Sequence, residues 1–201
     1  MGKVIESNED FIDSTKEGRK GELFFFEQYK EKVKDKGLTV VDVSGVWEWR
    51  NKDIDFLIMD GDKIVKTIEV KIDKRCDGFS KKGNGPTGNI TYEVVTHDRN
   101  GRQKTGWSEK TEADYAVLIL GDCNYKEKYL QVTRIVWVDM KKWREYKDTH
   151  PSELHTMKEQ HPKSDEDVIK DYRHNLDDLK KFGAVIKENN SVFGKRIDLK
   201  N

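Results

Sequence analysis

The chain has 201 residues, a length expected of one domain with a sizeable core. Charged residues make up 38% and hydrophobic residues 34%, but the 38 basic and 38 acidic side chains cancel. Aromatic residues account for 10%, whereas disordered chains usually have few aromatics and a large net charge, so this composition excludes disorder. The zero net charge argues against a uniformly basic protein, although a local basic face would still bind phosphates.

Neither the cysteines nor any apolar segment indicates secretion or membrane insertion. Cys76 and Cys123 are too few for a disulfide framework, which favours a reducing compartment. The N-terminal residues MGKVIESNED lack the apolar core of a signal peptide, and no apolar run approaches the ~20 residues of a membrane span. We therefore expect a cytoplasmic protein without membrane contact.

The first predicted element is a helix that begins near residues 14–15 and ends at Gly37. At about 100° per residue, one stripe of this helix is apolar apart from a single carboxylate. The stripe contains Glu22, Phe25, Phe26, Tyr29 and Val33. A carboxylate on a buried face is costly unless it is paired or bound to metal, which marks Glu22 as a candidate site residue. Glu27 points away from the stripe and is expected to be exposed.

Strands are predicted for most of the chain that follows, with polar loops over 73–88 and 97–112. The strand patterns cover residues 38–49, 53–59, 64–72, 89–95, 114–120 and 130–138. A helix is predicted to begin near Asp139, an exposed insertion to cover 147–163, a further helix to cover 164–182 and a short edge strand to cover 192–199. The last helix would bury Val168, Tyr172, Leu176 and Leu179. This mixture of strands and helices around a sheet is typical of the α/β class.

The strands predicted over 53–59 and 64–72 bring acidic residues and a lysine onto one face. Side chains alternate along a strand, so burying the isoleucine-rich faces of both strands leaves the charged residues together. The charged face carries Asp53, Asp55, Glu69 and Lys71. A two-residue turn would break the required register, whereas an odd-length loop or a bulge would restore it, and we expect an odd loop.

A charged strand face is often only a solvated surface, but Glu22 would add another carboxylate to this one. Clustered carboxylates repel one another unless a cation neutralises them, and carboxylate oxygens suit Mg²⁺ or Mn²⁺. Such an ion polarises a phosphodiester and lowers the pKa of a bound water. A lysine beside it can orient that water or neutralise developing charge.

Asp55, thirteen intervening residues and Glu69-Val70-Lys71 resemble the signature of the PD-(D/E)xK nuclease superfamily, with Ile54 where the signature has proline. Gly21-Glu22 matches the position of the family's helix glutamate. The segments GNITYEVV, KTGWSEKTEADYAVLIL and VFGKRIDL are similar to phage-borne and mobile-element members. The resemblance implies one nuclease domain over 1–201 with a restriction-endonuclease-like fold, in which helices flank a central mixed sheet.

The resemblance also implies roles for individual residues. Asp55 and Glu69 would bind Mg²⁺ or Mn²⁺, with the Val70 carbonyl and Glu22 contributing, and Lys71 would be the catalytic lysine. Asp53 and Glu93 are further candidates, and for Glu93 a plain surface position is equally open. The implied activity is hydrolysis of DNA phosphodiester bonds by an endonuclease of phage or mobile-element origin.

A DNA interface is expected around the loop that follows Lys71, where solvated charge is the alternative. Its candidate residues are Lys74, Arg75, Lys81, Lys82 and Trp107, the last of which could stack on a base or only anchor its loop. Two other functions stay open. One is a Holliday-junction resolvase acting as a homodimer, and the other is a catalytically idle relative that binds DNA or a protein.

Overall fold

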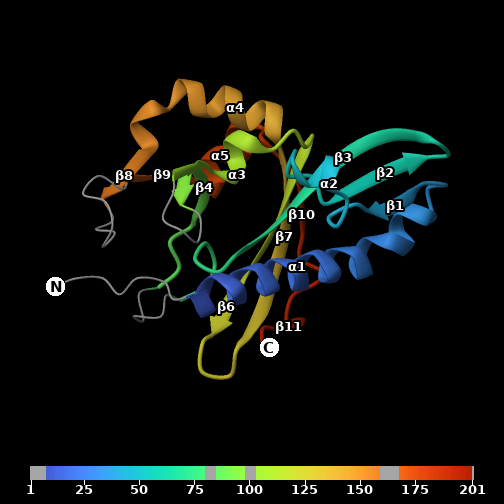
Figure 1. Ribbon diagram of the computed structural model, residues 1–201, viewed down its shortest axis with the longest axis horizontal. Helices are drawn as coiled ribbons and strands as arrows, with labels where there is room; N and C mark the ends of the chain where they lie inside the picture. Colours follow the sequence, from blue (N-terminus) through green and yellow to red (C-terminus); the bar gives the residue numbers. More distant parts are fainter. Residues whose placement is uncertain (1–7, 80–84, 98–102, 159–167, 201) are drawn as a thin grey trace.

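The computed structural model describes residues 8–79, 85–97, 103–158 and 168–200, and it is a mixed α/β fold (Figure 1). A central mixed sheet is flanked by helices, as the sequence predicts. Helix α1 (Asn8–Lys34) packs on one face of this sheet. Helices α4 (Met140–Thr149) and α5 (Leu176–Phe182), together with a smaller sheet, pack on the other face.

The central sheet has seven strands in the order β1-β2-β3-β6-β7-β10, and β11 also pairs with β7. Strands β3 and β6 are parallel, and the other pairs are antiparallel. The strands are β1 (Thr39–Asp42), β2 (Phe56–Asp60), β3 (Lys63–Asp73), β6 (Tyr115–Asn124), β7 (Tyr129–Asp139), β10 (Val185–Asn189) and β11 (Arg196–Asp198). A parallel pair needs a long crossover, and the chain between β3 and β6 supplies it.

That crossover carries much of a second, four-stranded sheet with the order β5-β4-β9-β8. Its strands are β4 (Asn89–His97), β5 (Gln103–Thr105), β8 (Leu154–Lys158) and β9 (Val168–Asn175). The crossover also contains the short helix α3 (Trp107–Lys110), whereas α2 (Trp47–Arg50) lies between β1 and β2 and a 3₁₀ turn covers Pro151–Glu153. Strand β3 is therefore followed directly by a segment that reaches the second sheet.

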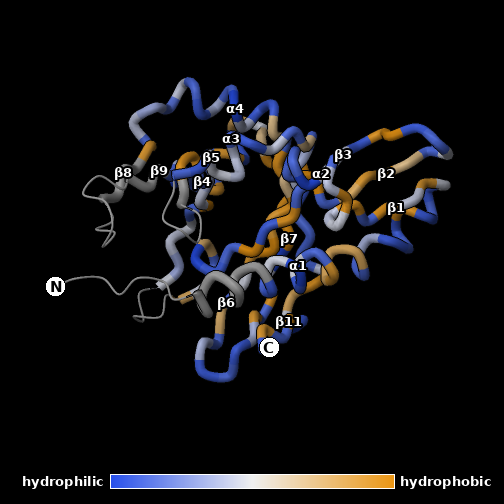
Figure 2. The backbone as a smooth tube through the Cα atoms, viewed as in Figure 1, coloured by the Kyte–Doolittle hydropathy of each residue, from blue (hydrophilic) through white to orange (hydrophobic). Residues whose placement is uncertain are grey.

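Strand β6 is buried on both faces because its alternating side chains enter two separate cores. On one side, Val117 and Ile119 pack in the core that contains α1. On the other, Ala116, Leu118 and Leu120 pack in the core that contains α4, α5 and β4. Figure 2 shows the apolar segments concentrated in the central strands.

Helix α1 presents the predicted apolar stripe to the sheet. Phe25 and Tyr29 are 0% and 3% exposed, and their rings stack at 4.8 Å. The helix begins by Asn8, so the predicted start near residues 14–15 is wrong, but its end is confirmed, because a turn follows Lys34 and Gly37 has a left-handed φ of 74°. Leaving a helix through the left-handed region favours glycine, which has no Cβ to clash.

The β2–β3 hairpin corrects the predicted loop. Asp60 pairs with Lys63, which leaves a two-residue turn, so the odd-length loop is wrong. The register is restored instead by a β-bulge between Ile58 and Met59. Beyond this bulge Ile64 is 40% exposed and does not join the predicted core.

The segment before β2 is also irregular. Strand β2 begins at Phe56 rather than Asp53, and Asp53 has a positive φ of 46°. As a result, Ile54 packs with Leu57 in a third, smaller core and not with Phe56 and Ile58 as predicted. Residues 38–49 likewise form a shorter strand than predicted, because Trp47–Arg50 is helical.

The helix predicted over 164–182 is wrong in its first half. Described residues from Val168 to Asn175 form strand β9, which pairs with both β4 and β8. The helix begins only at Leu176, where the Asn175 side chain accepts a hydrogen bond from the Asp177 N–H at 2.9 Å. Leu176 and Leu179 are buried, as predicted.

The predicted insertion over 147–163 is ordered in its described part. Residues 147–158 form the end of α4, the 3₁₀ turn and the edge strand β8, and residues 159–163 lie outside the described chain.

The helix predicted near Asp139 is confirmed, because the Asp139 carboxylate accepts the Lys142 N–H at 3.0 Å and caps α4. Over the described ranges, no helix combines the length and the apolar character that crossing a membrane requires.

Candidate active site

Asp55 is fixed at the point where the chain enters β2. Its backbone N–H donates to the Ile68 carbonyl at 2.9 Å, which aligns it with β3. Its Oδ2 atom accepts the Val70 N–H at 2.9 Å. The hairpin therefore places the Asp55 carboxylate against the Glu69–Lys71 segment of β3, although Asp55 itself lies just outside the strand.

Glu69 is a buried carboxylate whose two oxygens differ. The residue is 2% exposed, and its Oε1 pairs with the Lys71 ammonium. Its Oε2 has no hydrogen-bond partner among the described residues. Burial raises the pKa of Glu69 well above its usual range, and the charges of Asp55 and Asp53 add to this rise while Lys71 opposes it. An ionised carboxylate in this position lacks a second stabilising contact.

The Asp55 carboxyl group also has a raised pKa. Burial, followed by the negative charge of Glu22, raises its pKa to about 6, although Lys71 and the Val70 N–H favour the ionised form. The acidic cluster formed by Asp55 and Glu69 therefore holds more negative charge than Lys71 alone neutralises. A bound cation would relieve this repulsion.

Lys71 supplies the positive charge of the cluster. Burial by itself would lower its pKa, but the charges of Glu69 and Asp55 outweigh burial and raise the pKa above its ordinary value. The side chain is 36% exposed, so part of it is open to solvent. Lys71 is thus a protonated donor at neutral pH, held beside two carboxylates.

Glu22 lies on the inner side of α1, and its carboxylate pairs with Arg19. The Glu22 side chain is 16% exposed, whereas Glu27 is 58% exposed. Arg19 donates to Glu22 at 2.7 Å and also to Asp42 and Ser44. The influence of the Glu22 charge on the pKa of Asp55 places Glu22 in the electrostatic neighbourhood of the cluster. The structure thus gives Glu22 a second partner that the sequence analysis missed, although i, i+3 spacing is a signal for such pairs.

Helix α1 can approach β3 closely beside Glu22 because residue 21 is glycine. A Cβ at Gly21 would lie 2.8 Å from Cγ1 of Ile72, so even alanine would press on this side chain. The predicted Gly21-Glu22 pair therefore combines a packing role for the glycine with a charge that reaches the cluster.

The two further carboxylate candidates occupy different places. Asp53 pairs with Lys110 at 2.6 Å, and its carbonyl accepts the Thr111 hydroxyl at 2.8 Å. Its charge still contributes to the raised pKa values of Glu69 and Lys71, so it lies at the border of the cluster. Glu93 is exposed on β4 of the second sheet.

The residues that could hold a metal ion are two carboxylates and one carbonyl. In the described ranges no group of three His, Cys, Asp or Glu side chains is arranged around an ion site. Asp55 and the unpartnered Oε2 of Glu69, with the carbonyl of Val70, the residue after Glu69, nevertheless fit Mg²⁺. This ion is usually bound by one or two carboxylates and keeps several waters.

The polar loop predicted after β3 is firmly held at its base. The Asp73 carboxylate accepts the Arg75 and Cys76 N–H groups, each at 2.8 Å. The returning chain bonds the same segment, because the Thr87 N–H donates to the Arg75 carbonyl at 3.0 Å. A Cβ at Gly78 would lie 2.5 Å from the Gly121 carbonyl oxygen, which shows how closely this loop packs on β6.

The predicted DNA-binding residues of this loop are only partly described. Lys74 pairs with Glu17, and Arg75 is exposed. Lys81 and Lys82 lie outside the described residues. Cys76 and Cys123 are buried and form no disulfide, and burial raises the pKa of Cys76 to about 12, which leaves it a packing residue rather than a nucleophile.

Trp107 lies beside Lys71, although the two residues are distant in sequence. It is half-buried at the start of α3, and the Lys71 ammonium lies 5.6 Å from its ring centroid. No local sequence pattern joins residues 71 and 107, so this contact could not be found before the fold was known.

No known family model, curated protein or solved structure matches this chain.

Proposed function

We propose that the protein is a metal-dependent nuclease that hydrolyses phosphodiester bonds in DNA. The observation that carries the proposal is the buried Glu69 carboxylate, which has one oxygen without a hydrogen-bond partner and faces a second carboxylate of raised pKa. A protonated lysine lies beside both. Two desolvated carboxylates with a single lysine leave excess negative charge, which favours a divalent cation.

Each residue has a distinct role in this proposal. Asp55 and Glu69 hold Mg²⁺ or Mn²⁺ with help from the Val70 carbonyl, and Glu22 adds negative charge from α1. The ion, when bound, acts as a Lewis acid and lowers the pKa of a bound water. Lys71 donates to a phosphate oxygen or orients the water, because its ammonium is protonated and its side chain is partly open to solvent. The origin in a phage or mobile element belongs to the same proposal.

The test incubates the protein with linear, circular, single-stranded and branched DNA, with Mg²⁺, with Mn²⁺ or with a chelator. We expect cleavage only with metal, and the preferred DNA distinguishes a general endonuclease from a junction resolvase. DNA binding without cleavage in either metal would contradict the proposal and favour an idle relative.

Calorimetry tests the metal site directly. Asp55→Ala should bind Mg²⁺ or Mn²⁺ much more weakly than the wild type, because one of two carboxylate ligands is lost. Asp62→Ala is the matched control, since Asp62 is exposed in the turn of the same hairpin. Equal affinities in wild type and Asp55→Ala would remove Asp55 from the metal site.

A further inference from the structure

Lys71 has an aromatic neighbour in addition to its carboxylate partner. Its ammonium pairs with Glu69 and also lies 5.6 Å from the ring centroid of Trp107. A cation within about 6 Å of an aromatic ring is attracted by the negative face of the ring, and tryptophan gives the strongest attraction. The lysine is therefore held by two groups, one on its own strand and one outside the central sheet.

The backbone at Trp107 is tightly fixed to β4. A Cβ at Gly106 would lie 2.2 Å from the Glu93 carbonyl oxygen, so only glycine fits there without movement. The Gly106 N–H donates to the Val94 carbonyl at 2.8 Å. On the other side of Trp107, the buried Ser108 hydroxyl donates to the Glu93 carbonyl at 2.6 Å. These contacts fix the position of the backbone from which the Trp107 side chain projects.

The Trp107 ring is also packed into the second core. Its centroid lies 5.5 Å from that of Tyr92, which in turn stacks on Trp143 at 4.6 Å. Tyr92 and Trp143 are both 0% exposed. Because this aromatic stack is closely packed, Trp107 cannot shift without disturbing the core beneath it.

We infer that Trp107 is a positioning residue for the proposed nuclease reaction and acts by holding the Lys71 ammonium in its reactive place. A lysine stem has several rotatable bonds, and Glu69 alone would draw the ammonium onto its carboxylate. The Trp107 ring adds a second, fixed attraction that restricts the ammonium to the space between the two groups. This role rests on the proposed function, because it concerns the lysine that would act on the phosphate.

The contact itself can be measured without activity. In protein labelled with ¹³C at the lysine ε-carbon, the Lys71 signal is assigned as the one missing in Lys71→Arg. We expect an upfield ring-current shift of its ε-protons in the wild type, smaller in Trp107→Phe and lost in Trp107→Leu. The control is Trp47→Leu, since Trp47 is 77% exposed and should leave the Lys71 signal unchanged. An unshifted wild-type signal would overturn the inference.

Steady-state kinetics test the consequence. Trp107→Leu should lower kcat about 3- to 30-fold with little change in KM, whereas Trp107→Phe, which keeps a ring, should stay within about threefold of wild type. Trp107→Phe also retains most of the packing, so it answers the question if Trp107→Leu fails to fold.

A raised KM with unchanged kcat would overturn the positioning role and make Trp107 a substrate contact. Unchanged kinetics in both variants would overturn it as well. A wild type that cleaves no DNA would instead show that the proposed function has failed.

Discussion

Asp55, Glu69 and Lys71 are chemically interdependent, since each changes the protonation of the others. Glu69 is nearly inaccessible, and only one of its oxygens has a partner in the described chain. Removing Lys71 would leave this carboxylate buried without its cation, which is usually destabilising unless a metal takes over the compensation. The lysine thus contributes both to stability and to the proposed chemistry, and the two contributions can be separated.

We predict that Lys71→Ala, examined in Mg²⁺, folds and still binds DNA and metal but loses nearly all cleavage. Loss of a single donor to developing charge typically lowers the rate about 10²–10³-fold. Lys71→Arg should rescue poorly, because the planar guanidinium is bulkier than an ammonium. The measurement is single-turnover cleavage alongside circular dichroism and calorimetry.

The control for this prediction is Lys63→Ala, an exposed lysine at the start of the same strand. It should cleave DNA as the wild type does. If Lys71→Ala cut DNA at close to the wild-type rate, the assigned mechanism would be wrong even though the fold would stand.

At the scale of elements, two glycines allow close backbone contacts, one against the second sheet and one between the loop after β3 and the central sheet. Gly106 lies against the β4 backbone, Gly78 lies against the β6 backbone, and both positions leave no room for a Cβ. The atoms that a Cβ would meet are mostly backbone atoms, which cannot rotate away as a flexible side chain can. These glycines therefore determine how closely α3 and the loop after β3 approach their strands.

Gly106→Ala should consequently lower the free energy of unfolding by about 1–3 kcal/mol, the range typical of overpacking. Denaturant unfolding of the variant beside the wild type measures it. Gly18→Ala is the matched control, because no atom lies within 4 Å of a Cβ there and alanine favours a helix. Equal losses in both variants would mean that crowding at Gly106 is not the cause.

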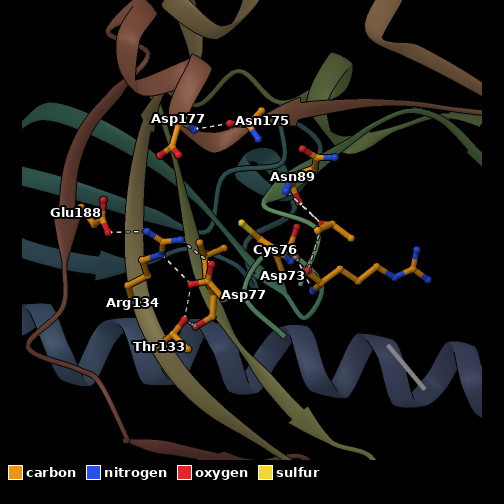
Figure 3. Close-up of polar contacts among 12 residues, drawn as sticks. Asp73, Cys76, Asp77, Asn89, Thr133, Arg134, Asn175, Asp177 and Glu188 are labelled. Carbon is orange, nitrogen blue, oxygen red and sulfur yellow. Dashed lines mark hydrogen bonds and ion pairs between the residues drawn. The ribbon is translucent and has the colours of Figure 1, made fainter. Parts of the chain in front are cut away.

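At the scale of the whole molecule, one polar network connects the loop after β3 to strands β7 and β10 of the central sheet and to helix α5. Figure 3 shows Arg134 on β7 between Asp77 and Glu188. Arg134 donates to Asp77 at 2.7 and 2.6 Å and to Glu188 at 2.8 Å, and Lys180 of α5 pairs with Glu188 at 2.8 Å. The network thus holds the loop, β7, β10 and α5 together.

This network predicts a pH dependence of stability. Burial by itself raises the pKa of Asp77, but the hydrogen bonds from Arg134 and Thr133 outweigh it and lower the pKa below the ordinary value of 3.8. An acid whose folded-state pKa is depressed stabilises the fold above its unfolded pKa, and this stability is lost as pH falls through the folded pKa. Asp77→Asn should therefore lower the free energy of unfolding by about 1–3 kcal/mol between pH 5 and 8.

Below about pH 4 the stability difference between Asp77→Asn and the wild type should shrink, since the wild-type carboxylate becomes protonated as well. Urea unfolding at a series of pH values measures it, with Asp62→Asn as an exposed control that should match the wild type throughout. A difference that is the same at pH 3 and pH 7 would show that the Asp77 charge does not contribute.

The sequence by itself determined the features that depend on local periodicity. The stripe of α1 predicted which residues it buries, including Phe25 and Tyr29, and alternation along β3 placed Glu69 and Lys71 on one face. The strands β6 and β7 were predicted for the same reason. Local periodicity specifies which side chains face inward, because burial of apolar side chains is favourable wherever the partner surface lies.

Only the tertiary structure decided which surfaces meet. The spacing of apolar residues over 168–175 fits a helix, but in the structure these residues pair with β4 as a strand. Pairing with β4 satisfies backbone N–H and C=O groups that would otherwise be unpaired in a buried layer, and this outweighs the local helix preference. The bulge in place of an odd loop and the left-handed backbone at Asp53 also depend on packing between elements. The contact between Trp107 and Lys71 joins helix α3 to strand β3 of the central sheet. Sequence spacing does not encode such a contact, because it exists only once the crossover has returned the chain to β3.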